Sequence, residues 1–199
     1  MSALELSSDV GIVAVIVISC NILLGLLMGV KYNPWKRWPH KRINYFKIHN
    51  WTGYTALTLS LLHVVLLLAS SEAKFRFVDV LYPMVGPKQP VINTLGAAAL
   101  YVLIVVVVTS YYRAAIGHDR WRIIHYGTYL TAGLFFVHGI WSDPSLKDNP
   151  IDYLDAEKVA IELSLLVILV ASFFRWRFAL QRRRSLGAQR QKQYIGAST

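Results

Sequence analysis

The sequence predicts an all-α integral membrane protein, a bundle of about five transmembrane helices. Two observations predict this class. Hydrophobic residues make up 55% of the 199-residue chain, and they gather in runs of about 20. A hydrocarbon core of roughly 30 Å needs about 20 helical residues to cross it, so each run is long enough for one span. The chain alternates between such runs and short polar or basic segments.

Five spans follow in order along the chain. Proline residues and charged residues separate them, and both end a membrane helix readily. The segment 71–90 is expected to be a mixed loop, and 142–156 an acidic loop. The domains are then a short N-terminal segment, a transmembrane helical domain and a basic tail, over 1–10, 11–176 and 177–199. The expected helices cover about 11–30, 47–70, 91–112, 121–141 and 157–176.

The distribution of charge predicts an orientation. Most of the 21 Lys and Arg residues fall in 31–47, 113–122 and 175–199, which lie on one side if there are five spans. Loops rich in Lys and Arg stay in the cytoplasm, so the N-terminus is expected outside and the C-terminus inside. The expected location is a bacterial inner (plasma) membrane. The same distribution explains the net charge of +10 by topology and contact with lipid, so we expect no nucleic-acid partner.

Composition excludes several kinds of site. Cys20 is the single cysteine, so the chain offers no intramolecular disulfide, no cysteine-based zinc site and no iron–sulfur cluster. No glycine-rich nucleotide-binding motif is present. We therefore expect neither a flavin site nor a nicotinamide site in this chain, and no catalytic residues of its own.

Four histidines lie inside two of the expected spans. His49 and His63 are 14 residues apart in one, and His125 and His138 are 13 apart in the other. Polar groups inside a membrane are costly and usually functional, and histidine is a common axial ligand of haem iron. The spacings correspond to roughly 21 and 20 Å along parallel helices. His49 can then pair with His125 as ligands of an inner haem iron, and His63 with His138 as ligands of an outer one.

Helical rotation supports only part of this arrangement. Fourteen residues bring His63 within roughly 40° of the direction of His49, whereas thirteen leave His138 roughly 140° from His125. Helix tilt, rotamer choice or a distortion near Gly127 or Gly133 would have to make up the difference. The expected cofactor is haem b, two copies or, if one pair fails to form, one.

The two histidine-bearing phrases resemble a known family. KIHNWTGYTALTLSLLHVV and WRIIHYGTYLTAGLFFVHGI are similar to the histidine helices of the ferric reductase-like transmembrane domain, and the resemblance covers roughly 11–176. This superfamily includes the NADPH oxidases, the ferric reductases and the haem-binding membrane subunit of the bacterial methionine sulfoxide reductase system. The resemblance implies that all four histidines are axial haem ligands. The family usually has six helices, with its histidines on the third and fifth, and we expect this chain to lack the first.

Four other residues are candidates for contact with haem. Arg42, Lys47 and Arg122 lie near the expected inner edge, where a haem propionate would attract a cation. Topology and contact with lipid headgroups are the favoured explanation for each of these charges taken singly. Trp51 is expected either to pack on a haem plane or to belong to the aromatic belt of the membrane interface.

These observations predict a membrane cytochrome b, the electron-transfer component of an oxidoreductase. Its electrons would come from a separate cytoplasmic flavoprotein reductase or from quinol, and would pass to an extracytoplasmic acceptor or partner protein. Two alternatives stay open. One is a haem-bearing anchor subunit of a larger respiratory, quinone-linked complex. The other is a haem-free channel or transporter that uses its intramembrane histidines.

Overall fold

Helices are the regular secondary structure of the part of the chain that the structure describes. The computed structural model describes residues 2–29, 44–147, 149–150 and 152–197, and these ranges contain no strand. The helices, in chain order, are α1 (Ala3–Gly29), α2 (Tyr45–Ala69), α3 (Phe77–Leu81), the 3-10 helix η2 (Pro83–Val85), α4 (Pro90–Tyr111), α5 (Arg113–Ile116), α6 (His118–His125), α7 (Gly127–Trp141) and α8 (Ala156–Ala197).

Four described helices, α1, α2, α4 and α8, are long and apolar enough to cross a membrane. The fourth expected span is divided: α6 ends at His125, Tyr126 interrupts the helix, and α7 begins at Gly127. With 15 residues, α7 alone is shorter than the other four. The fold is therefore an all-helical membrane bundle in which one expected span is a broken helix.

Several boundaries differ from those expected. α1 begins at Ala3 rather than near Gly11, and α8 continues to Ala197 rather than ending near Trp176. Hydrophobicity marks where a span leaves the lipid, but helix propensity decides where the helix ends. The segment after Trp176 is rich in Arg, Gln, Ala and Leu, which are good helix formers, and it contains no proline. The expected loop 71–90 also contains α3 and η2.

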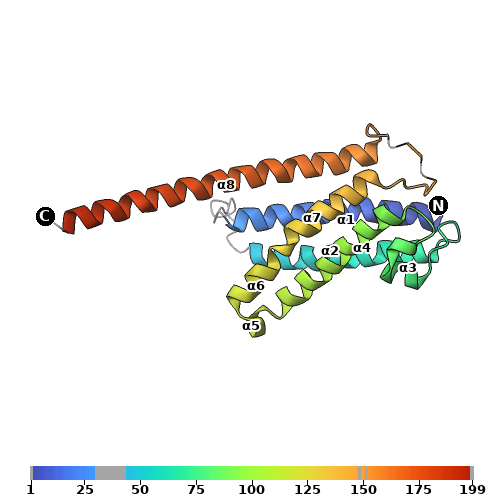
Figure 1. Ribbon diagram of the computed structural model, residues 1–199, viewed down its shortest axis with the longest axis horizontal. Helices are drawn as coiled ribbons and strands as arrows, with labels where there is room; N and C mark the ends of the chain where they lie inside the picture. The colour runs from blue at the N-terminus through green and yellow to red at the C-terminus, as the bar shows by residue number, and fades with distance from the viewer. Residues whose placement is uncertain (1, 30–43, 148, 151, 198–199) are drawn as a thin grey trace.

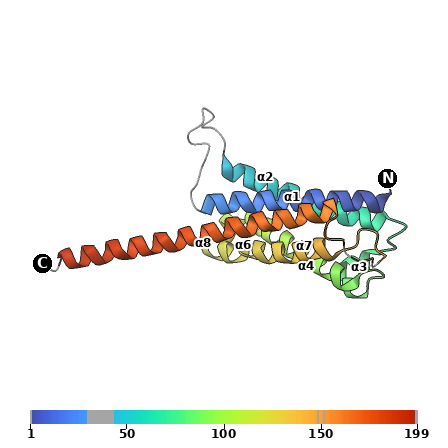
Figure 2. The same ribbon diagram turned by 90° about the horizontal axis from the view of Figure 1, so that it is seen from above.

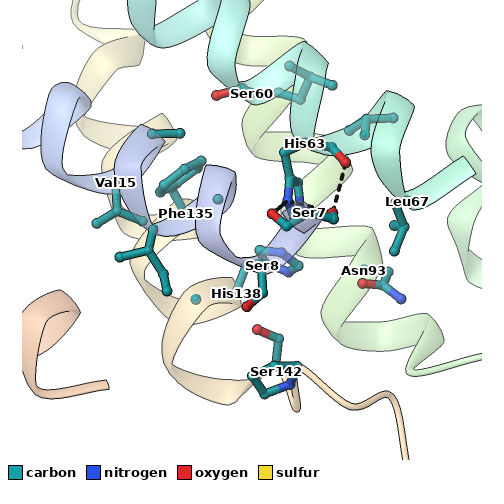
Figure 3. Close-up of a pocket in the computed structure, with 18 of the residues that line it drawn as sticks. Ser7, Ser8, Val15, Ser60, His63, Leu67, Asn93, Phe135, His138 and Ser142 are labelled. Atoms are coloured by element: carbon teal, nitrogen blue, oxygen red, sulfur yellow. Dashed lines mark hydrogen bonds between the residues drawn. The ribbon is translucent and has the colours of Figure 1, made fainter. Parts of the chain in front are cut away.

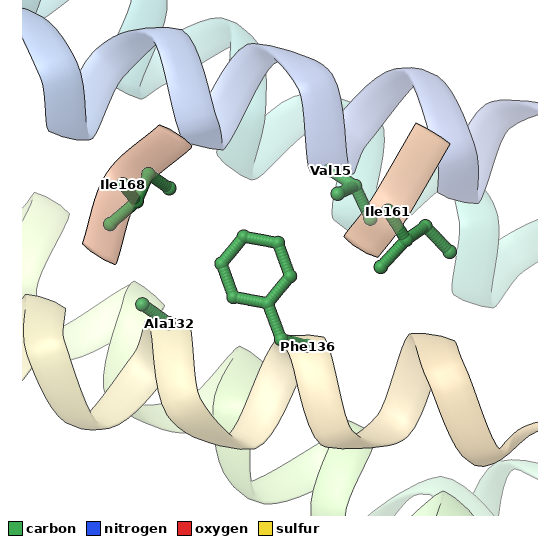
Figure 4. Close-up of a cluster of buried hydrophobic side chains, with 5 residues drawn as sticks. All are labelled: Val15, Ala132, Phe136, Ile161 and Ile168. Atoms are coloured by element: carbon green, nitrogen blue, oxygen red, sulfur yellow. The ribbon is translucent and has the colours of Figure 1, made fainter. Parts of the chain in front are cut away.

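The long helices run side by side along one axis (Figure 1). α1 packs along α2, α4 packs along α7, and α8 crosses over α1 and α7. Figure 2 shows that α8 continues well past the end of the other helices. One core cluster joins three of these helices, and its side chains face one another between α1, α7 and α8 (Figure 4); it consists of Val15, Ala132, Phe136, Ile161 and Ile168.

The surface is apolar, as expected for a protein whose solvent is lipid. Large hydrophobic side chains such as Val65, Val105 and Leu169 are at least half exposed on the long helices. The tightest helix contacts are instead made by small residues: Ala14 and Ala56 are 1% exposed, and Ala99 is fully buried. In lipid, helices associate through such close packing because apolar side chains gain little by leaving the hydrocarbon.

Charged residues of opposite sign gather at opposite ends of the bundle. The N-terminus, α3 and the loop with Asp143, Asp152 and Asp155 share one end (Figure 1). α5, α6 and the continuing part of α8 lie at the other, where Gly29 approaches the guanidinium of Arg175. We call these the acidic end and the basic end.

Candidate functional site

The pair near the basic end consists of His49 on α2 and His125, the last residue of α6. Their ring centroids are 6.1 Å apart and their ring planes meet at 71°. Both rings line a cavity of about 60 Å³ that Asn21 and Ser110 also line. The helices thus bring together two imidazoles that are 76 residues apart in the sequence. We call this the inner pair.

The spacing of the inner pair fits two axial ligands on one iron. Two metal–imidazole bonds of about 2 Å, with about 1 Å more from each nitrogen to its ring centre, separate the ring centroids by about 6 Å. Within the described residues, no group of three or more His, Cys, Asp or Glu side chains is placed to hold a metal ion. A bare zinc ion usually takes three or four protein ligands, whereas haem iron takes at most two. The donor set therefore suits haem iron better than a free metal ion.

The pair near the acidic end consists of His63 on α2 and His138 on α7. Both line a cavity of about 160 Å³ between α1, α2, α4, α7 and the start of α8, and Figure 3 shows their rings entering it from two different helices. Apolar side chains such as Val15, Leu67 and Phe135 form much of the lining, with Ser7, Ser60 and Asn93 among the polar groups. We call this the outer pair.

Hydrogen bonds fix which nitrogen of each ring faces its cavity. Nδ1 of His63 is 2.7 Å from the carbonyl oxygen of Ser7, and Nδ1 of His138 is 2.9 Å from that of Ile92. Nδ1 of His49 is 3.1 Å from the carbonyl oxygen of Asn21. A carbonyl only accepts, so these three Nδ1 atoms carry the hydrogen and Nε2 keeps its lone pair. This is the arrangement of a metal-binding histidine, whose other nitrogen donates to a backbone or carboxylate oxygen.

His125 is held differently from the other three. Its Nδ1 lies 3.3 Å from Oγ of Ser110, and the same oxygen accepts a hydrogen bond from Nε1 of Trp121 at 3.1 Å. A hydroxyl oxygen has two acceptor lone pairs, so Ser110 can accept from Trp121 and His125 together. In that arrangement the Nε2 of His125 is also free to bind a metal.

An irregularity in the helix hydrogen bonding at Tyr126 lies between His125 and His138, whose directions are mismatched in a regular helix. A continuous helix would point these residues roughly 140° apart. The backbone N–H of Tyr126 lies within reach of three successive carbonyls, those of Arg122, Ile123 and Ile124, and α7 starts afresh at Gly127. A distortion near Gly127 was one of the ways in which the sequence could satisfy both pairs. A Cβ at Gly127 would lie 3.2 Å from Val106, so α7 begins in close contact with α4.

The remaining candidates lie outside both cavities or outside the described residues. Arg42 belongs to the latter group. Lys47 and Arg122 are exposed, and neither is among the residues that line the inner cavity. Trp51 is 61% exposed and packs edge-on against Tyr54, which does line that cavity. This position suits an interfacial tryptophan better than one stacked on a cofactor.

Sequence reasoning missed Lys158, near the start of α8. It is only 5% exposed and lines the outer cavity. Its Nζ donates to the carbonyl oxygens of Gly139 and Ser142 at 2.8 and 2.6 Å, at the C-terminal end of α7. A cation there stabilises the unpaired carbonyls and the negative end of the helix dipole. Lys158 thus ties α8 to the helix that carries His138.

The loop after α7 is organised by Asp143. Its carboxylate accepts hydrogen bonds from the backbone N–H groups of Ser145, Lys147 and Asn149 and from the Ser145 hydroxyl. Partial burial pushes the pKa of Asp143 upward, but these hydrogen bonds outweigh it and hold the pKa below its ordinary value. The backbone N–H of Asp143 in turn donates to Gln89 at 3.1 Å, which joins this loop to the start of α4.

Fold and site together define a class: helical membrane proteins in which paired histidines from different helices face internal cavities. The family model described as "Ferric reductase like transmembrane component" matches residues 10–136, more than half of the chain. The chain belongs to this family. The matched range includes His49, His63 and His125, and His138 follows two residues after its end. No match was found among curated proteins or among solved structures.

Proposed function

We propose that this membrane electron-transfer component is a cytochrome b with two bis-histidine haems. The inner haem would be held by His49 and His125, and the outer haem by His63 and His138. The observation that carries the proposal is the pairing itself. Each pair joins two helices, and the inner rings have the separation of two axial ligands. The Nδ1 of each histidine is within hydrogen-bonding distance of an oxygen on α1 or α4.

Haem iron, when bound, supplies reversible one-electron chemistry. The protein holds the imidazoles at two depths, orients their Nε2 atoms and surrounds them with apolar side chains that limit access of water. His49 and His63 are separated by roughly 21 Å along α2, so the two sites together extend across most of a bilayer. This depth difference is what a path for electrons from one face to the other requires.

The two ends of the bundle suit different partners. Under the orientation with the N-terminus outside, the basic end faces the cytoplasm, where exposed Arg120, Arg122 and Arg177 would steer an acidic flavoprotein reductase. Quinol from the membrane is the other donor that the proposal admits. The acidic end, with Asp152 and Asp155, would face the extracytoplasmic acceptor. In this topology α6 and α7 together make the fourth of the five crossings.

The test is an absorption spectrum of the detergent-purified chain, oxidised and reduced, with haem counted as its pyridine adduct. The proposal predicts a six-coordinate b-type spectrum and close to two haems per chain. One haem per chain would contradict the assignment of one pair. Well-folded protein without haem, purified from haem-replete cells, would overturn the proposal and favour a channel or transporter.

A further inference from the structure

α1 carries no histidine, yet it is hydrogen-bonded to both the ring and the backbone carbonyl of each histidine of α2. The carbonyl oxygen of Ser7 accepts from Nδ1 of His63, and the Ser7 hydroxyl donates to the backbone carbonyl of His63 at 2.9 Å. Asn21 does the same for His49: its carbonyl accepts from Nδ1, and its side-chain amide donates to the carbonyl of His49. Ser7 and Asn21 are 14 residues apart, the spacing of His49 and His63.

A glycine follows each of these α1 residues by four positions. In an α-helix the Cβ at position i+4 leans towards the N-terminus and covers the carbonyl at position i. A Cβ at Gly11 would lie 3.0 Å from Nδ1 of His63, and one at Gly25 would lie 3.3 Å from Cε1 of His49. The glycines therefore leave open the two carbonyls that the imidazoles reach.

α4 repeats the arrangement for the other two histidines. The carbonyl of Ile92 accepts from His138, and Gly96 follows four residues later. A Cβ at Gly96 would lie 2.8 Å from Cε1 and 2.9 Å from Nδ1 of His138, closer than the ring allows. Fourteen residues after Gly96 comes Ser110, whose hydroxyl takes the place of the carbonyl as the partner of His125.

We propose that α1 and α4 orient the histidine ligands of both haem sites. Their positioning residues are Gly11, Gly25, Gly96 and Ser110. This inference rests on the proposed haem function. At each position a helical carbonyl that the side chains leave uncovered, or a hydroxyl, accepts from Nδ1. This fixes the tautomer and ring orientation and raises the basicity of the ligating Nε2. The oxygen is available because the residue that would cover it is glycine, or because serine supplies the oxygen itself.

Close helix packing alone does not explain the pattern. Packing glycines would meet any side chain of the facing helix, as Gly127 meets valines and Gly139 meets Ile161. In the described part of the chain, the glycines whose added Cβ would meet a histidine ring are Gly11, Gly25 and Gly96. In each case the ring is hydrogen-bonded to the carbonyl four residues earlier.

The steric test uses alanine at each glycine. Gly96→Ala should lower haem affinity the most and Gly11→Ala less, both at the outer pair, and Gly25→Ala should lower it least, at the inner pair. The contacts lengthen in that order. Loss of a partner that orients a metal ligand typically costs 10- to 100-fold in affinity. The matched control is Gly133→Ala, on the same helix as His138, where an added Cβ meets nothing within 4 Å. Haem per chain and the electron paramagnetic resonance g-values of the oxidised haems report the change at each site.

Ser110 allows a test without steric conflict. Ser110→Ala removes the oxygen that accepts from His125, so the inner haem should bind about tenfold more weakly. Its midpoint potential should rise, because a less basic imidazole stabilises the ferric state less. Ser110→Thr keeps the hydroxyl and should restore both properties, which a purely structural role for Ser110 would not require.

The possible outcomes distinguish a failure of this inference from a failure of the proposed haem function. A wild-type protein without haem would overturn both. A wild-type protein with two haems, together with a Gly96→Ala variant that matches Gly133→Ala in haem content, g-values and potential, would overturn the inference and leave the cytochrome intact. If Gly96→Ala does not fold, the Ser110 variants decide: an inner haem unchanged in Ser110→Ala contradicts the inference.

Discussion

The inner and outer histidine pairs have the same ligands but different supports. Both rings of the outer pair are hydrogen-bonded to backbone carbonyls within continuous helices. In the inner pair, His125 ends a short helix and relies on a side-chain hydroxyl, Ser110. The outer cavity is also larger, about 160 against about 60 Å³. A backbone partner persists through substitution of its own side chain, so the outer site is the more robust of the two and the inner site the more adjustable.

The largest expected effect comes from removing one ligand. His63→Ala or His138→Ala should cost the outer haem, and His49→Ala or His125→Ala the inner one, leaving close to one haem per chain in each case. Pyridine-adduct counting measures the loss. Unchanged haem content in both outer variants would contradict the ligand assignment and remove the basis of the comparison.

Replacing Lys158 tests the end of the bundle that supports the outer pair. Lys158→Met removes two charge-assisted hydrogen bonds at the C-terminal end of α7, and we expect a loss of about 3 kcal/mol in the free energy of unfolding. Unfolding in mixed detergent micelles measures it. Lys147→Met, at an exposed lysine of the loop between α7 and α8, is the control and should change little. As Lys158→Met unfolds, haem should be lost from the outer pair before the inner pair. The reverse order would contradict the role of Lys158.

A smaller effect is expected at Phe136, which is 2% exposed in the cluster shared by α1, α7 and α8. Phe136→Ala leaves a cavity, but the transfer term is small because an apolar side chain gains little by leaving lipid. We therefore expect a loss of about 2 kcal/mol in the free energy of unfolding. Phe173→Ala, at a 51% exposed position on α8, should be nearly neutral. Both variants should keep the g-values of both haems, because neither residue is among those that line the two cavities. A change at one pair alone would show that the core supports the pairs unequally.

The smallest effect concerns the loop beside the outer pair. Because the folded pKa of Asp143 is depressed, its hydrogen bonds contribute stability that is complete above the unfolded pKa of about 4 and is lost as the pH falls through the folded pKa. The amide shifts of Ser145, Lys147 and Asn149 should therefore titrate together only below about pH 4. Asp143→Asn should abolish this titration. A titration retained in that variant would assign it to another group.

Much of the bundle can be predicted from the sequence, because apolar runs report contact with lipid directly. The same signal does not show where a helix stops once it leaves the lipid, so the continuation of α8 past Trp176 was missed. It also cannot choose between tilt, rotamer and distortion, and the interruption at Tyr126 required the structure. Lys158 resembles an ordinary interfacial lysine in the sequence, since its burial depends on the carbonyls at the end of α7.

The sequence does contain a signal of the helix positions that hold the histidines. Gly11 and Gly25 are 14 residues apart, and so are Gly96 and Ser110. Both spacings equal that of His49 and His63. Small residues in apolar helices usually indicate helix packing, so this coincidence of spacing acquires meaning only when the carbonyls four residues earlier are seen to meet imidazoles.

The register of α1 has a consequence for how this protein can evolve. Because one helix holds histidines at both depths, an insertion or deletion between Ser7 and Asn21 would turn one contact by about 100° and move it about 1.5 Å relative to the other. Related genes are therefore expected to vary freely in the residues that α1 turns towards lipid, but to keep the number of codons between these two positions. A length change there would have to be matched by an equal change in α2.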